Sequence, residues 1–192
     1  MKRLARYLLL VPVVEIRHCA DFEEDNLTVD VYVDSDWAGC RSTRKSTSGG
    51  MIAVAGDVVK TWSSTQGSIA LSVAEAEYYA AVKGAAESLG VQSLLADLGF
   101  ESKIKMWQDS SAAKSIANRA GIGKIRHLDV RWLWLQGAVR SKQLACLKIA
   151  GLENPSDIMT KPKNVSEIIR LGSKVGFEFV VSETAENWNA HD

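Results

Sequence analysis

Acidic side chains stand at several points where the pattern of the chain changes. The apolar alternation of LTVDVYVDSDWAG stops at Asp34 and Asp36, and the run KIKMWQD stops at Asp109. Two close carboxylates at a strand end repel each other, because neighbouring anions disfavour joint ionisation. A divalent cation offsets this repulsion, and carboxylate oxygens are ligands that hard cations such as Mg²⁺ prefer. For one strand alone, a solvated acidic end is the alternative interpretation.

The longest helical segment, 72–98, carries two further carboxylates in its opening turns. Ser72 and Glu75 fit a capping box, in which the Ser side chain accepts a backbone N–H and the Glu reaches back to the start of the helix. Glu77 lies just beyond these capping contacts and is free for other chemistry. Because residues two apart point about 200° apart around a helix, Glu75 and Glu77 are not expected to face one site.

The elements that would position these residues follow from periodicity and turn signals. The predicted strands are 27–34, 49–55, 58–64, 103–109 and 144–149. The predicted helices are 72–98, 110–120, 126–139 and an amphipathic segment over 164–175, with Asp157 in the first turn of a further helix that Asn154-Pro155 begins. Gly84 and Gly90 weaken the long helix by roughly 1 kcal/mol each and indicate close approach to the sheet or a bend.

The order of these elements is β-β-β-α-β-α-α-β-α, which indicates an α/β fold. Three consecutive strands form an antiparallel meander, and the later strands alternate with helices. We therefore predict a mixed five-stranded sheet with helices on its faces. Strand ends and helix starts of such folds meet at one edge of the sheet, so the carboxylates are expected to converge there.

The chain has 192 residues, of which 46% are hydrophobic and 24% charged, and its net charge is zero. This composition is typical of a soluble globular domain, and any nucleic-acid surface is expected to be a local patch. Cys19, Cys40 and Cys146 lack metal-ligand spacing, which predicts reduced thiols in the cytoplasm or nucleus. No apolar run reaches membrane-spanning length. The opening MKRLARYLLLVPVV is interpreted as a short helix rather than a signal peptide, because Arg6 and Pro12 interrupt it.

Six motifs carry a resemblance to a known family: VDSDWAG, STSGG, WSSTQGSIALSVAEAEY, QDSSAA, KIRHLDVRW and NPSDIMTKP. In this order they closely resemble the ribonuclease H domain of copia-type LTR retrotransposon polyproteins. The resemblance implies a ribonuclease H-like fold over residues 27–162. Residues 1–26 are then a reverse transcriptase–ribonuclease H junction remnant and linker, because KRLARYL resembles the end of the reverse transcriptase region. Residues 163–192 are expected to form a C-terminal helix and a disordered tail.

The resemblance implies hydrolysis of the RNA strand of RNA–DNA hybrids with two Mg²⁺ or Mn²⁺ ions. Matched motif by motif, the implied catalytic and metal-ligating residues are Asp34, Glu77, Asp109 and Asp157. Asp34 would bridge both ions, Glu77 and Asp109 would complete one site, and Asp157 would help to hold the other. Asp36 falls where relatives tolerate Ser and is expected to be accessory.

The candidate substrate-binding residues are Ser35, Ser110, Arg44, Lys124, Arg126 and His127. The two serines adjoin proposed ligands and are candidates to read 2′-hydroxyls, with turn or cap roles as the alternative. The basic residues are candidate phosphate contacts, with a solvated surface as the alternative. The histidine matches a family position, where a helix-start hydrogen bond and a phosphate contact are the two interpretations.

The resemblance implies an RNA–DNA hybrid as partner, and also the reverse transcriptase domain of a parent polyprotein, with a virus-like particle as a further setting. No membrane is implied. One alternative function is a co-opted or degenerate module that binds hybrid nucleic acid or a protein without turnover. Survival of all four carboxylates argues against it. A second alternative, an integrase- or resolvase-like nuclease, is disfavoured by the helical Glu and the QDSSAA segment.

Overall fold

The computed structural model describes residue 9 and the ranges 13–16, 27–121 and 133–180. Within them, no helix combines the length and apolar character that crossing a bilayer requires. The main sheet contains β2 (Leu27–Ser35), β3 (Thr47–Val54), β4 (Asp57–Thr65), β5 (Ser102–Gln108) and β6 (Leu144–Lys148).

The strand order of this sheet is β4-β3-β2-β5-β6. β2, β3 and β4 pair antiparallel, whereas β5 pairs parallel with both β2 and β6. The predicted mixed five-stranded sheet is therefore confirmed, and so are its five strands to within two residues at each end. The pattern of β2 explains its central place, because Leu27, Val29, Val31 and Val33 are all buried.

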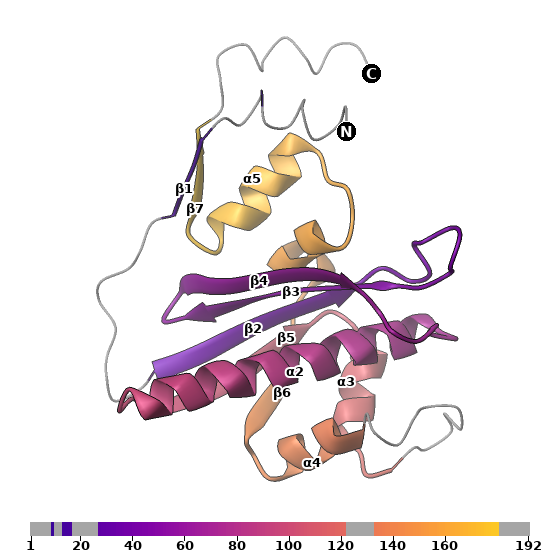
Figure 1. Ribbon diagram of the computed structural model, residues 1–192, viewed down its shortest axis with the longest axis vertical. Coiled ribbons are helices and arrows are strands. Elements are labelled where there is room, and N and C mark those ends of the chain that lie inside the picture. Colours follow the sequence, from indigo (N-terminus) through magenta and orange to yellow (C-terminus); the bar gives the residue numbers. More distant parts are fainter. Residues whose placement is uncertain (1–8, 10–12, 17–26, 122–132, 181–192) are drawn as a thin grey trace.

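Helix α2 (Val73–Asp97) runs across one face of the sheet, with α3 (Ser111–Asn118) and α4 (Trp134–Arg140) on the same side (Figure 1). Ser72 caps α2 as predicted, since its side chain accepts the N–H of Glu75 at 3.2 Å. A Cβ at Gly84 would lie 2.4 Å from Cγ1 of Val33, so the helix approaches the sheet too closely there for a side chain. Close approach, one of the two expectations for this glycine, is therefore correct.

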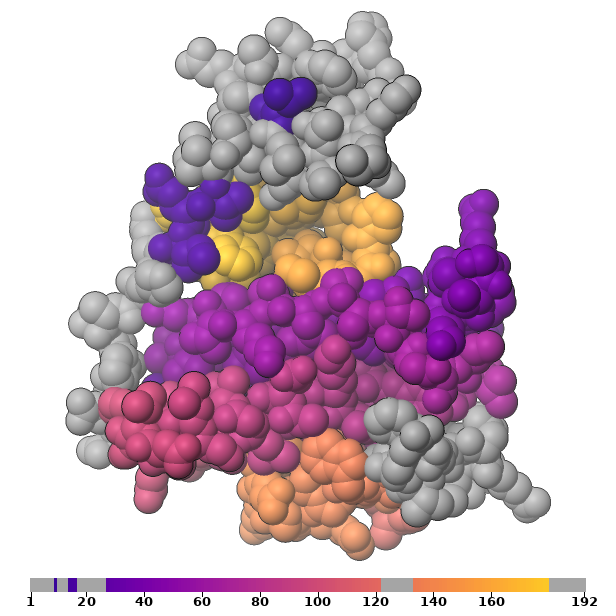
Figure 2. Space-filling view, viewed as in Figure 1, coloured from indigo at the N-terminus to yellow at the C-terminus, as the bar shows by residue number. Residues whose placement is uncertain are grey.

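The other face of the sheet carries the short 3₁₀ helices η3 (Gly151–Glu153) and η4 (Pro155–Met159) and the helix α5 (Val165–Ser173). Figure 2 shows α5 in yellow on one side of the sheet-and-α2 body and α4 in orange on the other. The turn containing Asp157 is thus 3₁₀ rather than α. The first part of the predicted helix 126–139 lies outside the described residues.

A second sheet joins the two ends of the described chain. β1 (Val13–Ile16) pairs antiparallel with β7 (Phe177–Val180), and β7 packs on α5 (Figure 1). The sequence analysis predicted no strand after the helix over 164–175, so β7 is an element that it missed. The expected disorder beyond residue 181 lies outside the described residues, and the division into 1–26, 27–162 and 163–192 stays a prediction.

Candidate metal centre

The register of the central strands brings two carboxylates side by side. β2 and β5 are parallel, and Tyr32 pairs with Trp107. Two residues further along the chain, Asp34 lies next to the end of β2 and Asp109 directly follows the end of β5. Because parallel neighbours in register end at the same edge, both side chains arise at one point of the sheet.

The first turns of α2 bring Glu77 to the same edge. Single carboxylate oxygens of Asp34, Glu77 and Asp109 all lie within 4.8 Å of one another. Residues far apart in sequence, from a strand end, a helix and a second strand end, thus form one acidic cluster. Three of the four predicted ligands are brought together, although their assignment as catalytic residues stays a prediction.

Burial makes this cluster electrostatically unusual. Asp34 is 1% exposed and Glu77 is 5% exposed. Desolvation raises the pKa of Asp34 to about 6, and the charges of Asp157 and Asp109 act in the same direction. Desolvation, followed by the charges of Asp34 and Asp109, raises the pKa of Glu77 to about 8. Without an added cation, the ionised cluster is therefore disfavoured.

The donor set fits a divalent cation. Oε2 of Glu77 is buried and has no hydrogen-bond partner in the part of the chain that the structure describes. A buried carboxylate oxygen without a partner is costly, and a metal ligand role removes that cost. Carboxylate oxygens at this spacing suit Mg²⁺ or Mn²⁺.

The fourth predicted ligand, Asp157, lies beside this cluster in an ion-pair network. Its carboxylate pairs with Lys161 at 2.9 Å and with Lys163 at 2.5 Å. Although desolvation acts to raise the pKa of Asp157, the hydrogen bonds from the two lysines outweigh it and the pKa is lowered. Lys161 also reaches Oδ2 of Asp34, at 3.3 Å, and the hydroxyl of Thr160 donates to the same oxygen.

Asn154 fixes the position of the 3₁₀ turn that carries Asp157. Its buried amide donates to the carbonyl of Val33 at 2.9 Å, directly before Asp34. Its Oδ1 accepts the Ser156 hydroxyl at 2.7 Å. Across the sheet, Gly49 leaves room for the turn, because a Cβ there would lie 2.7 Å from Cβ of Met159. Sequence analysis identified Asn154 only as a cap and missed this link to β2.

Glu75 has a different environment from Glu77. It is buried, and its carboxylate accepts the N–H of Leu71 at 2.8 Å and the hydroxyl of Tyr79. The expected partner was the backbone of Ser72, so the contact reaches one residue further back along the chain. Glu75 therefore stabilises the start of α2, and it is not a member of the acidic cluster.

Three polar residues near the cluster have distinct surroundings. The Ser35 hydroxyl is buried beside Glu77, and its interaction with the Glu77 carboxyl acts to lower the pKa of that residue. The Ser110 hydroxyl accepts the N–H of Ala113 at 3.1 Å and caps α3, which is the alternative role left open above. The Asp36 carboxylate accepts the N–H of Thr47 and closes the loop after β2.

The predicted basic contacts are only partly described. Arg44 is exposed in the loop between β2 and β3, with a φ of 56°. Lys124, Arg126 and His127 lie outside the described residues. Sequence analysis missed Lys161 and Thr160, although both belong to the motif NPSDIMTKP. The i, i+4 spacing of Asp157 and Lys161 was the available signal.

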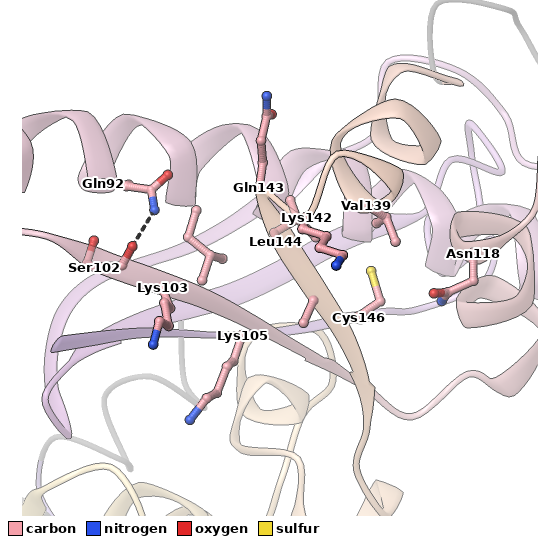
Figure 3. Close-up of a pocket in the computed structure, with 12 residues that line it drawn as sticks. Gln92, Ser102, Lys103, Lys105, Asn118, Val139, Lys142, Gln143, Leu144 and Cys146 are labelled. Carbon is pink, nitrogen blue, oxygen red and sulfur yellow. Dashed lines mark hydrogen bonds between the residues drawn. The ribbon is translucent and has the colours of Figure 1, made fainter. Parts of the chain in front are cut away.

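A surface pocket at the other end of β5 is separate from this cluster. Gln92, Ser102, Lys105 and Cys146 are among its lining residues, and Gln92 donates to the carbonyl of Ser102 at 2.7 Å (Figure 3). None of the four predicted carboxylates lines it. The acidic cluster, not this pocket, is therefore the candidate centre.

A mixed sheet in this strand order, crossed by one long helix, defines a ribonuclease H-like domain. The chain is a relative of the Pol polyproteins of copia-type transposons. It is 33% identical over 156 residues to the retrovirus-related Pol polyprotein from transposon TNT 1-94 of Nicotiana tabacum, which covers 79% of this chain. It is 25% identical over 180 residues to that from transposon RE1 of Arabidopsis thaliana, covering 92% of this chain. The chain spans 12% of the length of each of these relatives.

Solved structures give a weaker likeness. Two structures of LC11-RNase H1, a protein isolated from compost by a metagenomic approach, match with a TM-score of 0.47. The first is 15% identical and covers 71% of this chain, and the second is 16% identical and covers 69%. The match includes 93% of each LC11-RNase H1 chain. The second structure is a complex with an RNA/DNA hybrid. No protein-family model matches the chain.

Proposed function

We propose that this chain is a metal-dependent ribonuclease that hydrolyses the RNA strand of RNA–DNA hybrids during retrotransposon reverse transcription. The observation that carries the proposal is the convergence of Asp34, Glu77 and Asp109 to within 4.8 Å from three separate elements. The relationship to transposon Pol polyproteins supports a role in copying nucleic acid. In this proposal the enzyme acts inside the cell, as a segment of a longer polyprotein.

Each acidic residue has a proposed task. Asp34, Glu77 and Asp109 hold one divalent ion, and Asp34 with Asp157 holds a second. When bound, such ions activate a water and stabilise the charge that develops on the phosphate and on the leaving oxygen. The protein itself holds the carboxylates in a buried and fixed arrangement, so that little rearrangement is needed when substrate binds.

The proposal assigns the recognition of RNA to groups next to the cluster. Ser35 directly follows Asp34, and its hydroxyl lies beside Glu77 at the edge of the cluster. A hydroxyl group can donate to and accept from the 2′-hydroxyl that distinguishes RNA from DNA. Ser110 already caps α3, which makes Ser35 the stronger candidate. Arg44, together with Lys124, Arg126 and His127, remains proposed for phosphate contacts.

We expect the chain to cleave the RNA strand of a labelled hybrid when Mg²⁺ or Mn²⁺ is present, and to lose this activity in chelator. Double-stranded RNA and double-stranded DNA of the same sequence serve as matched substrates and should resist cleavage. Equal cleavage of double-stranded DNA, or activity that chelation leaves unchanged, would contradict the proposal. Hybrid binding without cleavage would instead support the co-opted binding module.

A further inference from the structure

The ammonium group of Lys161 lies between two carboxylates of the centre. Its Nζ is 3.3 Å from Oδ2 of Asp34 and 2.9 Å from Oδ1 of Asp157. These two residues are the pair to which the proposed function assigns the second divalent ion. The side chain of Lys161 is 45% exposed, so solvent reaches it directly.

The positive charge of Lys161 offsets part of the negative charge of the acidic cluster. Its charge acts to lower the pKa of both Asp34 and Glu77, against the effect of desolvation. Burial of Lys161 acts to lower its own pKa, but the pairs with Asp157 and Asp34 outweigh burial and raise it above the ordinary value. Lys161 is therefore held as a cation by the acidic residues around it.

We propose that Lys161 is a built-in counter-ion that competes with the second divalent ion for Asp34 and Asp157, an inference that rests on the proposed function. The protein then binds one ion tightly at Asp34, Glu77 and Asp109. It binds a second ion only when the ammonium group moves away. The movement breaks both ion pairs, and the long, flexible and solvent-exposed lysine side chain then has room to turn toward water.

A neighbouring lysine provides a matched control. Lys163 pairs with Asp157 at 2.5 Å and with Glu167 at 3.4 Å, whereas its ion pairs within the described residues do not include Asp34. Lys161→Met and Lys163→Met remove the same charge from the same partner, Asp157. Only the first substitution also removes a cation from Asp34. The two variants therefore separate a specific competition from a general change in net charge.

The test is a Mn²⁺ titration of the full chain, without substrate, by calorimetry and by electron paramagnetic resonance. In Lys161→Met we expect the second Mn²⁺ to bind about tenfold or more tightly than in the unaltered chain, the effect of one close charge in partly buried surroundings. In Lys163→Met the gain should be clearly smaller. An unchanged or weaker second site in Lys161→Met, or an equal gain in both variants, would overturn the proposal.

Thermal melts check that the variants fold and give a second readout. Removal of the ammonium group leaves Asp34 less compensated, so Lys161→Met should melt at a lower temperature in chelator and gain more from Mn²⁺ than the unaltered chain. Lys161→Gln should behave in the same way. If the unaltered chain cleaves no hybrid but these shifts occur, only the proposed function fails. If it cleaves hybrid and both Lys161 variants bind Mn²⁺ like the unaltered chain, only this inference fails.

Discussion

Glu77→Gln is expected to reduce hybrid cleavage by more than about a hundredfold, beyond the loss typical when an outer partner of a metal ligand is removed. The amide keeps the size of the side chain but loses the negative charge that would bind a cation. Its stability in chelator should be unchanged or higher, because the charge of Glu77 is disfavoured in the folded state. Initial cleavage rates and thermal melts of the purified variant are the measurements.

Glu75→Gln is the matched control, two residues away on the same helix. An amide has one carbonyl oxygen, so it cannot accept from both Leu71 and Tyr79 in the way the carboxylate does. Loss of one such buried hydrogen bond costs about 1–3 kcal/mol. We therefore expect a lower melting temperature with cleavage largely retained. If Glu75→Gln is instead the inactive variant and Glu77→Gln the less stable one, the assignment of the catalytic Glu is wrong.

In chelator, the protein should lose stability as the pH rises from about 4 to about 8, because carboxyl groups with raised pKa values bind more protons in the folded than in the unfolded state. The window follows from Asp34, whose pKa rises from 3.8 to about 6, and Glu77, whose pKa rises from 4.5 to about 8. The contribution of these groups is thus present in mild acid and lost toward alkaline pH. Saturating Mg²⁺ should remove most of the loss.

Asp34→Asn tests the origin of this pH dependence. A neutral amide removes one charge from the cluster, so the variant should melt at a higher temperature than the unaltered chain in chelator near pH 8, and its stability should fall less with pH. It should also lose cleavage, since Asp34 is assigned to both ions. Chemical denaturation at several pH values, with and without Mg²⁺, measures the effect. An Asp34→Asn protein that melts lower in chelator, or that still cleaves, would contradict it.

Much of the fold was predictable, because the sequence patterns that indicate its strands and helices are local. The alternation of β2 and the Ser72 cap of α2 depend on neighbouring residues, and both were found where the sequence indicated. The convergence of Asp34 and Asp109 followed from the rule that parallel strand ends share an edge. These features require no knowledge of side-chain direction across the sheet.

The features that sequence did not predict depend on distant parts of the chain. Lys161 is a partner of Asp34 only because Asn154 anchors its turn to the carbonyl of Val33. Neither the alternation nor the capping pattern contains information on that contact. β7 is four residues long and pairs with β1 from the other end of the chain, so no local turn signals it.

The pairing of β1 with β7 has a consequence for how the chain folds during synthesis. Val13 pairs with Val180, so the connection between them contains the whole main sheet and its helices. β1 leaves the ribosome before the other strands of the described chain, and its partner β7 is the last of them to follow. Closing so long a connection carries a large entropy cost unless the intervening domain has already brought the ends together. We therefore expect the small sheet to form after the main sheet and to open before it, so the amide protons of β1 and β7 should exchange with solvent well before those of β2.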